Sequence, residues 1–387
     1  MVSSVASIIM QFNMNNIEIL LNLGYQVDIA CNFEQGNTIS SKSIVAFKDT
    51  LKSLHVNCHH IDFSRESYII WKHCRAYKAL LDLTRINTYD FIHCHAPISS
   101  AISRLVAFRT NTPVIYTAHG LHFYKGSSLL SWLLYYPMEW TFAKFTNTLI
   151  TINQEDFEFA KKHLKADKVE YLPGVGVQTS HFRLANFNVE EHRKKYNVSK
   201  DEFVILSVGE LSKNKNHQVI IKALYELKDV QFTYLIAGIG KERGHLQALI
   251  DKFGLHNKVR LLGYQKDIPS LCNIADVFAF PSIREGLPFA LVEAMASGLP
   301  SIVSNARGIR DVAVHGETGM VYYHNNSIGF ACGIETLMKN LILRKKMGMS
   351  AQRRAEEFDI AKVSINMSRI YREIDNISMI KLKKRDI

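Results

Sequence analysis

Short apolar segments alternate with longer helical patterns along almost all of the 387 residues, and this alternation constrains the fold more than any other feature. The apolar segments are rich in β-branched and aromatic residues and read as apolar on both faces, which is typical of parallel strands covered by helices. Alternating strands and helices over this length predict an α/β protein with doubly wound sheets. The expected strands are Gln26–Cys31, Val56–Asp62, Phe91–His95, Pro113–His119, Thr148–Asn153, Phe203–Gly209, Phe232–Gly238, Val259–Gly263, Val277–Ser282, Pro300–Ser304 and Met320–Tyr323.

The alternation falls into two series that meet near Tyr171–Val177 (YLPGVGV). We therefore expect two Rossmann-like domains that face a cleft, because ligands of open α/β sheets bind beyond the carboxyl ends of the strands. The expected boundaries are residues 1–170 and 171–355, followed by a helical tail over residues 356–387. The opening residues MVSSVAS resemble the end of a strand, so the first strand is expected to be short.

Two further patterns narrow the class of protein. The longest strongly apolar stretch, Ser127–Pro137, is shorter than the roughly 20 residues of a membrane-spanning helix. Because the N-terminus also lacks the pattern of a signal peptide, a cytoplasmic protein is expected. The six cysteines include no CxxC pair, which indicates free thiols, most of them buried, and no structural zinc site.

Most of the net charge of +11 belongs to residues 339–387, which hold 13 basic and 6 acidic side chains. Such a basic end suits phosphates, anionic lipid or nucleic acid, although a solvated helical face explains it equally well. No segment resembles a nucleic-acid-binding module, so no nucleic-acid partner is expected.

Two glutamates eight positions apart, Glu285 and Glu293, lie in the segment REGLPFALVEAMASGLP. Glu293 falls within an apolar helix, where an ionised carboxylate costs several kcal/mol unless a partner satisfies it. A ribose diol could supply that partner, while Glu285, in a loop, could face a sugar hydroxyl or a developing positive charge. The start of the helix, at Gly286 and Leu287, offers backbone N–H groups to a phosphate. The alternative is that Glu285 is a surface loop glutamate and Glu293 is a helix glutamate in an ion pair.

A second polar loop follows the strand at Phe203–Gly209 and contains Lys213 and Lys215. Lysine at the carboxyl end of a strand can meet a diphosphate as a point charge, although a solvated loop lysine is the alternative for each. The nearby segment AGIGKERG does not form a GxGxxG fingerprint, which argues against a nicotinamide dehydrogenase.

The first half of the chain places histidines at two strand ends. His119 follows the strand at Pro113–His119, where it could donate to a substrate or act as a base. His93 and His95 share one face of another strand and read as core or cleft residues rather than metal ligands. The aromatic helix within Ser127–Phe145, flanked by Lys125 and Lys144, suits either a membrane interface or an internal core.

The segments FPSIREGLPFALVEAMASGLPSIVS, TAHGLHFY and GELSKNKNH together resemble the family-4 retaining glycosyltransferases of the GT-B fold, particularly those of bacterial capsule and exopolysaccharide synthesis. The resemblance covers nearly the whole chain, and the E-x7-E pattern is its most specific part. It implies transfer of a sugar from a nucleotide-diphosphate sugar, expected to be a UDP-sugar, with retention at the anomeric carbon. The implied acceptor is a polyprenyl-diphosphate-linked glycan at the inner face of the plasma membrane, with no metal and no cofactor.

The resemblance also implies a role for individual residues. His119, from the acceptor-side domain, and Glu285 would contact the donor sugar and are the expected catalytic residues. The remaining donor-binding residues would all belong to the nucleotide-sugar-binding C-terminal domain: Lys215 with Lys213 and the backbone of Gly286 and Leu287 for the diphosphate, Glu293 for the ribose diol, and Tyr264 for the base.

Two departures from the family pattern stand out. Many members have arginine where this chain has Glu210, which leaves Lys215 as the main cation. The short first strand also puts in question the first loop, Ser3–Ser7, which should approach the donor phosphates. Two alternatives stay open: a nucleotide-sugar 2-epimerase on the same fold, and a non-catalytic subunit that presents the lipid carrier to a partner.

Overall fold

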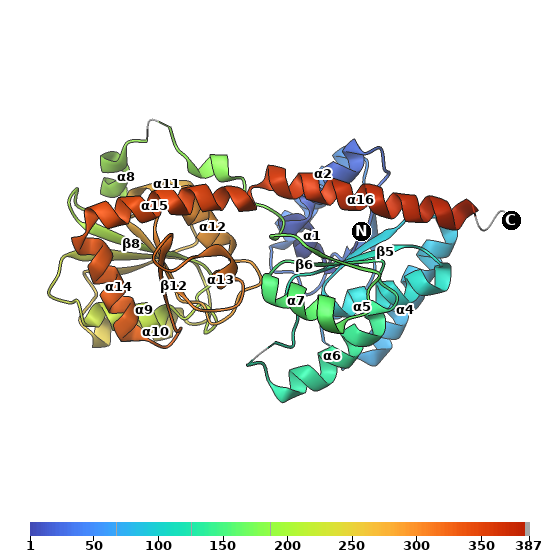
Figure 1. Cartoon of the computed structure of the whole chain (residues 1–387), viewed down its shortest axis with the longest axis horizontal. Helices are drawn as coiled ribbons and strands as arrows, with labels where there is room; N and C mark the ends of the chain where they lie inside the picture. Colours follow the sequence, from blue (N-terminus) through green and yellow to red (C-terminus); the bar gives the residue numbers. More distant parts are fainter. Residues whose placement is uncertain (67, 125, 186, 384–387) are drawn as a thin grey trace. The chain divides into compact units, whose positions relative to one another are not determined.

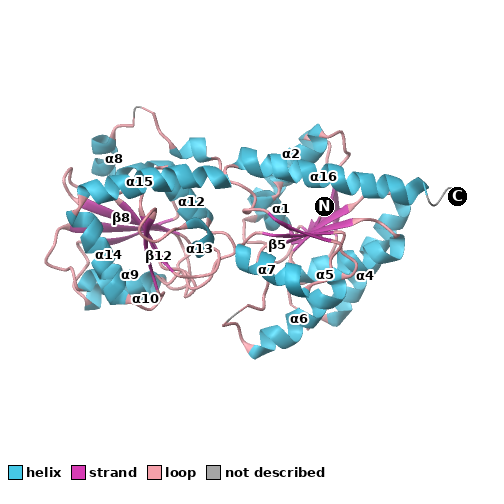
Figure 2. Cartoon of the chain, viewed as in Figure 1, coloured by secondary structure: helices cyan, strands magenta, loops and turns pink. Residues whose placement is uncertain are grey.

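The computed structural model describes residues 1–66, 68–124, 126–185 and 187–383, which form two compact units (Figure 1). The first unit consists of Met1–Val175 together with the chain from Ala361 onward, and the second is Gly176–Ile360. Each unit contains one wholly parallel sheet with helices on both faces (Figure 2). The predicted fold class, two Rossmann-like domains with doubly wound parallel sheets, is confirmed.

The sheet of the first unit has the strand order β3-β2-β1-β4-β5-β6-β7. From β3 to β6 this is the Rossmann order, in which the direction of winding reverses between β1 and β4. The strands are β1 (Val2–Val5), β2 (Asp28–Asn32), β3 (Asn57–His60), β4 (Ile92–His95), β5 (Val114–Ala118), β6 (Thr148–Thr151) and β7 (Lys168–Tyr171).

Two separate layers of helices cover this sheet (Figure 1). One layer consists of α1 (Ala6–Phe12), α2 (Met14–Asn22), α3 (Ser41–Ser53) and α16 (Ile360–Lys383). The other consists of α4 (Ile70–Ile86), α5 (Pro97–Thr110), α6 (Leu129–Ala143) and α7 (Gln154–His163). Although α16 is the last helix of the chain, its Met367, Ile370 and Tyr371 pack among the buried residues of α1, α2 and α3, so the end of the chain completes the first unit.

The sheet of the second unit has the order β10-β9-β8-β11-β12-β13, which is again the Rossmann order, with its reversal between β8 and β11. The strands are β8 (Phe203–Val208), β9 (Phe232–Ala237), β10 (Val259–Gly263), β11 (Val277–Phe280), β12 (Ser301–Ser304) and β13 (Gly319–Tyr322). The helices are α8 (Val189–Lys195), α9 (His217–Tyr225), α10 (Arg243–Lys252), α11 (Ile268–Ile274), α12 (Phe289–Ala296), α13 (Ile309–Val312), α14 (Ser327–Lys339) and α15 (Leu341–Ala355).

Several expectations from the sequence are corrected by the structure. Strand β7 was not among the expected strands, because its Lys-Val-Glu-Tyr sequence is half charged. Strand β3 is largely exposed rather than apolar on both faces, since it is an edge strand with one neighbour. The cysteines are all free, but only Cys31, Cys94 and Cys272 are buried, whereas Cys58, Cys74 and Cys332 are exposed.

Among the described residues, no helix is both long and apolar enough to cross a bilayer.

Candidate active site

The point where the second sheet reverses its winding lies between the carboxyl ends of β8 and β11. The chain leaves β8 through the loop at 209–216 toward α9, and leaves β11 through the loop at 281–288 toward α12. In open α/β sheets this reversal creates a crevice that binds ligands. The two loops that carry Lys215 and Glu285 therefore start at one place, although they are far apart in the sequence.

Lys215 and Glu285 form an ion pair in this crevice. The Lys215 Nζ lies 2.7 Å from the Glu285 Oε1, and both side chains are mostly buried. The same ammonium lies 4.6 Å from the centre of the Phe280 ring, within the range of a cation–π contact. The sequence predicted separate contacts for the two residues with diphosphate and sugar, and it did not predict that they touch each other.

Hydrogen bonds from one backbone N–H and two asparagine side chains fix the two loops to one another. The Ile283 N–H donates to the Asn214 carbonyl at 2.8 Å, and the Asn214 side-chain amide donates to the Arg284 carbonyl at 2.9 Å. Asn216, which is buried and has a φ of +54°, donates to the carbonyls of Pro281 and His324. Neither asparagine was predicted from the sequence; their position beside Lys215 in the segment KNKNH is the signal that could have revealed them.

Glu293 is the fifth residue of α12, eight positions beyond Glu285, and its side chain is mostly buried. Burial raises the pKa of the Glu293 carboxyl from 4.5 to about 6. Within the part of the chain that the structure describes, no group forms a hydrogen bond or an ion pair with this carboxylate. The backbone N–H groups of Gly286 and Leu287 likewise donate to no described residue. The segment thus combines one acceptor and two donors that can serve a polar ligand.

The other expected donor-binding residues lie at the same edge of the sheet. Lys213 is exposed in the loop after β8, and Tyr264 is exposed directly after β10. Because β9 stands between β8 and β10, Tyr264 is farther along the edge than Lys215. No contact within the described residues joins Lys213 or Tyr264 to the ion pair.

In the first unit, His119 follows β5 and belongs to a cluster of three histidines. The His119 Nε2 lies 3.2 Å from the Nδ1 of the fully buried His95, at the end of β4. Burial lowers the pKa of His119 from 6.5 to about 4, so its imidazole is neutral near pH 7. A neutral His119 can donate or accept a hydrogen bond but does not present a positive charge to a phosphate.

His93 is the core member of the cluster. Its Nδ1 lies 2.9 Å from the Tyr371 hydroxyl of α16, and its Nε2 lies 2.8 Å from the Thr117 hydroxyl. Burial holds the pKa of both His93 and His95 well below 6.5. In the described part of the chain, no group of three or more metal-ligating side chains is arranged to hold a metal ion.

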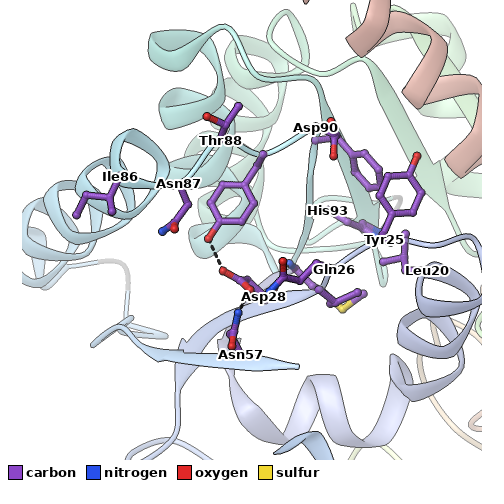
Figure 3. A pocket seen from close by; sticks show the side chains of 14 residues that line it. Leu20, Tyr25, Gln26, Asp28, Asn57, Ile86, Asn87, Thr88, Asp90 and His93 are labelled. Carbon is purple, nitrogen blue, oxygen red and sulfur yellow. Dashed lines mark hydrogen bonds between the residues drawn. The ribbon is translucent and has the colours of Figure 1, made fainter. Parts of the chain in front are cut away.

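A pocket lies at the amino ends of strands in the first sheet, the end opposite to His119, and its polar groups differ from those of the crevice at Lys215 (Figure 3). Asp28 and Asn57 are the first residues of β2 and β3, so this pocket lies at the amino ends of the strands. The Asp28 carboxylate already accepts hydrogen bonds from Tyr89 at 2.6 Å and from Asn57 at 2.7 Å. Since its charged group is satisfied within the protein, this pocket is a weaker candidate for a substrate site than the crevice at Lys215.

Two family descriptions match the chain, and together they cover β1–β6 of the first sheet and the whole of the second. Residues 2–153 match the family described as glycosyl transferase 4-like. Residues 188–354 match the family described as glycosyl transferases group 1.

Relatives and solved structures agree with these matches. The putative glycosyltransferase EpsD of Bacillus subtilis (strain 168) is 35% identical over 302 residues, which cover 76% of this chain and 79% of EpsD. An Escherichia coli protein named UDP-Gal:alpha-D-GlcNAc-diphosphoundecaprenol alpha-1,3-galactosyltransferase is 31% identical over 238 residues, or 59% of this chain and 61% of that protein. The crystal structure of HepE from Anabaena in complex with UDP and glucose covers 96% of this chain and 99% of HepE, with a TM-score of 0.77 and 19% identity. At that identity the likeness shows the fold alone.

Proposed function

The chain belongs to the group 1 glycosyltransferases, with the GT-B fold, and we propose that it transfers a sugar from a UDP-sugar to a glycan on a polyprenyl-diphosphate carrier. The proposed reaction retains the configuration of the anomeric carbon and serves capsule or exopolysaccharide synthesis. The observation that carries the proposal is the ion pair of Lys215 and Glu285 in the crevice between β8 and β11. Glu285 precedes α12, the helix that contains Glu293.

The proposed donor site uses each group according to its charge. Lys215, with Lys213 and the N–H groups of Gly286 and Leu287, supplies positive potential to the diphosphate. As the bond between the sugar and the diphosphate breaks, negative charge grows on the leaving oxygen, and these same groups stabilise it. When the diphosphate takes Lys215 as its partner, Glu285 becomes available to the sugar.

The remaining contacts orient the two ends of the donor. Glu293 accepts hydrogen bonds from the ribose diol, which gives its carboxylate partners and favours the ionised form. Tyr264 is proposed to contact the base. His119, as a neutral imidazole, is proposed to hydrogen-bond the donor sugar. The leaving phosphate accepts the proton of the acceptor hydroxyl, so the mechanism assigns no side chain as general base.

The proposed donor and acceptor rest on the relatives. The Escherichia coli relative is named for a UDP-galactose donor and an acceptor on diphosphoundecaprenol, and the HepE structure contains UDP. A lipid-linked acceptor would bring the enzyme into peripheral contact with the cytoplasmic face of the membrane.

Calorimetric titration of the purified protein with UDP and with uridine tests the donor site. We expect Lys215→Met to weaken UDP binding about 10- to 100-fold, the worth of a hydrogen bond to a charged group, and to leave uridine binding unchanged. Lys222→Met, an exposed lysine on α9, is the matched control and should bind both ligands like the wild type. Equal affinity of the wild type for UDP and uridine, or an unchanged Lys215→Met, would overturn the assignment.

Transfer itself is tested with a panel of UDP-sugars and a polyprenyl-diphosphate-linked acceptor. We expect product only when both substrates are present. The NMR spectrum of the product should show the same anomeric configuration as the donor sugar. A donor sugar that is epimerised without any acceptor would instead show the 2-epimerase reaction.

A further inference from the structure

The outward face of α6 is apolar, the reverse of an ordinary surface helix. Leu129, Leu130 and Leu133 are 82%, 73% and 75% exposed, and Leu134 and Trp140 also reach solvent. Their spacing places them along one side of the helix. The inward side packs Trp132, Tyr135 and Tyr136 against the core of the first unit. A surface helix normally turns charged residues outward, so the outward leucines of α6 need a separate explanation.

The exposed side of α6 also lacks negative charge. Glu139 is the one acidic residue in the α6 sequence, and it is buried. Its carboxylate lies 2.9 Å from the Arg104 guanidinium and accepts a hydrogen bond from the Tyr116 hydroxyl at 3.0 Å. The only formal charge of the helix is therefore neutralised inside the protein.

Positive charge lies at the end of the same helix. The Lys144 Nζ lies 3.9 Å from the centre of the exposed Trp140 ring. On α5, the exposed Phe108 packs against Phe145 with 4.5 Å between ring centres, and the next residue, Arg109, is exposed. Lys125, which flanks the other end of the segment, lies outside the described residues.

We propose that the α6 face, made of Leu129, Leu130, Leu133, Leu134 and Trp140 with Lys144 at its edge, docks on a bilayer that contains anionic lipid. The inference deepens the proposed function, in which the acceptor is carried on a membrane lipid. A helix of 15 residues is about 22 Å long and cannot span a bilayer. It can lie in the interface, where leucine side chains reach the acyl boundary and tryptophan sits at the headgroups.

The charges favour a membrane over a second copy of the chain. Two apposed α6 faces would bury Lys144 of each copy against a helix that has no exposed carboxylate to compensate its charge. Anionic headgroups, in contrast, offer a counter-charge to Lys144.

Co-sedimentation of the full-length protein with vesicles, without nucleotide, tests the proposal. Vesicles of phosphatidylcholine with phosphatidylglycerol are compared with vesicles of phosphatidylcholine alone. We expect the wild type to bind the anionic vesicles, and Leu130→Ser/Leu133→Ser to bind them at least about 10-fold less, because two exposed leucines no longer enter the interface. Lys144→Ala should lower binding to anionic vesicles roughly fivefold and leave any binding to neutral vesicles unchanged.

The control is Ile342→Ser on α15, which is 82% exposed and lies beside the basic residues Arg344–Lys346. It should bind vesicles like the wild type. Wild-type protein that stays in the supernatant, a double variant that still binds, or an equal loss in Ile342→Ser would each overturn the proposal. A dimer in light scattering that the double variant abolishes would show instead that the α6 face contacts a second copy.

The proposed function is tested separately in the same samples. The double variant should keep the wild-type melting temperature and UDP affinity, because the substituted leucines are exposed in the first unit and Lys215 lies in the second. Vesicle binding without UDP binding would refute the donor site and leave the membrane surface standing. UDP binding without vesicle binding would refute the membrane surface and leave the donor site standing.

Discussion

Glu293, which we propose binds the donor, is expected to reduce the stability of the folded protein at neutral pH. Its carboxyl ionises near pH 4.5 when unfolded and near pH 6 in the folded protein, so the folded state holds this proton more tightly. This tighter binding lowers the free energy of unfolding. The loss is absent below pH 4.5 and complete above pH 6, where it amounts to about 2 kcal/mol. We expect Glu293→Gln to raise the melting temperature at pH 7.5 by a few degrees and to weaken UDP binding about 10-fold.

The comparison for this prediction is Glu317→Gln, the same change at an exposed position of the second unit. Thermal denaturation at pH 7.5 and at pH 4.5 should show a gain only for Glu293→Gln and only at the higher pH. A Glu293→Gln protein that is less stable than the wild type at pH 7.5 would mean that the ionised carboxylate is satisfied in the folded state.

The residue types of the candidate site could be proposed from the sequence, but their partners within the protein could not. The spacing of Glu285 and Glu293 placed one in a loop and the other in a helix, as the structure has them. The ion pair between Lys215 and Glu285 depends on β8 and β11 being neighbours, and residue spacing does not contain strand order. The raised pKa of Glu293 similarly depends on the helices packed around α12.

At the scale of elements, the turn before α13 presses against the loop that carries Glu285. Gly308 has a φ of +76°, and a Cβ added there would lie 2.3 Å from the Gly286 carbonyl oxygen. That oxygen belongs to backbone, so the loop itself has to move. We expect Gly308→Ala to weaken UDP binding at least about 10-fold, because the backbone groups proposed to bind the diphosphate would be displaced together. Calorimetric titration measures this loss.

Gly316→Ala separates this collision from backbone strain. Gly316 has a φ of +78°, and an added Cβ there meets no atom within 4 Å. Both substitutions carry the left-handed penalty of about 1–2 kcal/mol, so both should lower stability. Only Gly308→Ala should lose UDP affinity, and equal affinities in the two variants would contradict the proposed position of the phosphate loop.

Helices α5 and α6 are joined by a buried charge pair whose partners depend on each other. Arg104 is fully buried, and its guanidinium lies 2.9 Å from Glu139. Glu139→Ala leaves that guanidinium charged and unpaired, so we expect a loss of about 3–5 kcal/mol in the free energy of unfolding, measured with urea. The double variant Arg104→Met/Glu139→Leu should be more stable than Glu139→Ala alone. A double variant that is less stable than Glu139→Ala would show that the unpaired guanidinium of Arg104 is not the cause of the loss.

The depth of burial of a strand largely decides whether it could be predicted from the sequence. Central strands such as β8 and β9, buried on both faces, are continuous apolar runs in the sequence and were expected close to their observed bounds. The edge strands β3 and β7 carry polar residues such as Asn57 and Lys168, and their side chains are exposed or half-buried. Strand β3 was nevertheless expected within Val56–Asp62, whereas β7 resembles a loop and was not expected.

Among the described residues, the buried clusters of the first unit and the cluster of the second unit share no residue. The buried clusters around β1–β6 belong to the first unit, including the residues of α16, and the cluster around β8–β13 belongs to the second. Because each unit has its own core, each is expected to unfold as a cooperative unit.

Acid acts differently on the two units. Burial keeps His93, His95 and His119 of the first unit neutral, with pKa values below 6.5, so the unfolded chain binds more protons and this unit loses stability as the pH falls from 6.5 toward 4. In the second unit His217, whose pKa burial lowers to about 4, acts in the same direction. Glu293 acts in the opposite direction, because its protonation between pH 6 and 4.5 removes a destabilising charge.

Differential scanning calorimetry at pH 7.5 and pH 5.5 should therefore resolve two transitions, with acid lowering the midpoint of the first unit by more than that of the second. UDP identifies them, because a ligand that binds one native unit raises the midpoint of that unit alone. We expect the UDP-sensitive transition to be the one that resists acid. A UDP-sensitive transition that falls most at pH 5.5 would contradict the assignment of the three histidines as the dominant acid-sensitive groups, and a single transition that UDP raises as a whole would show that the two cores unfold together.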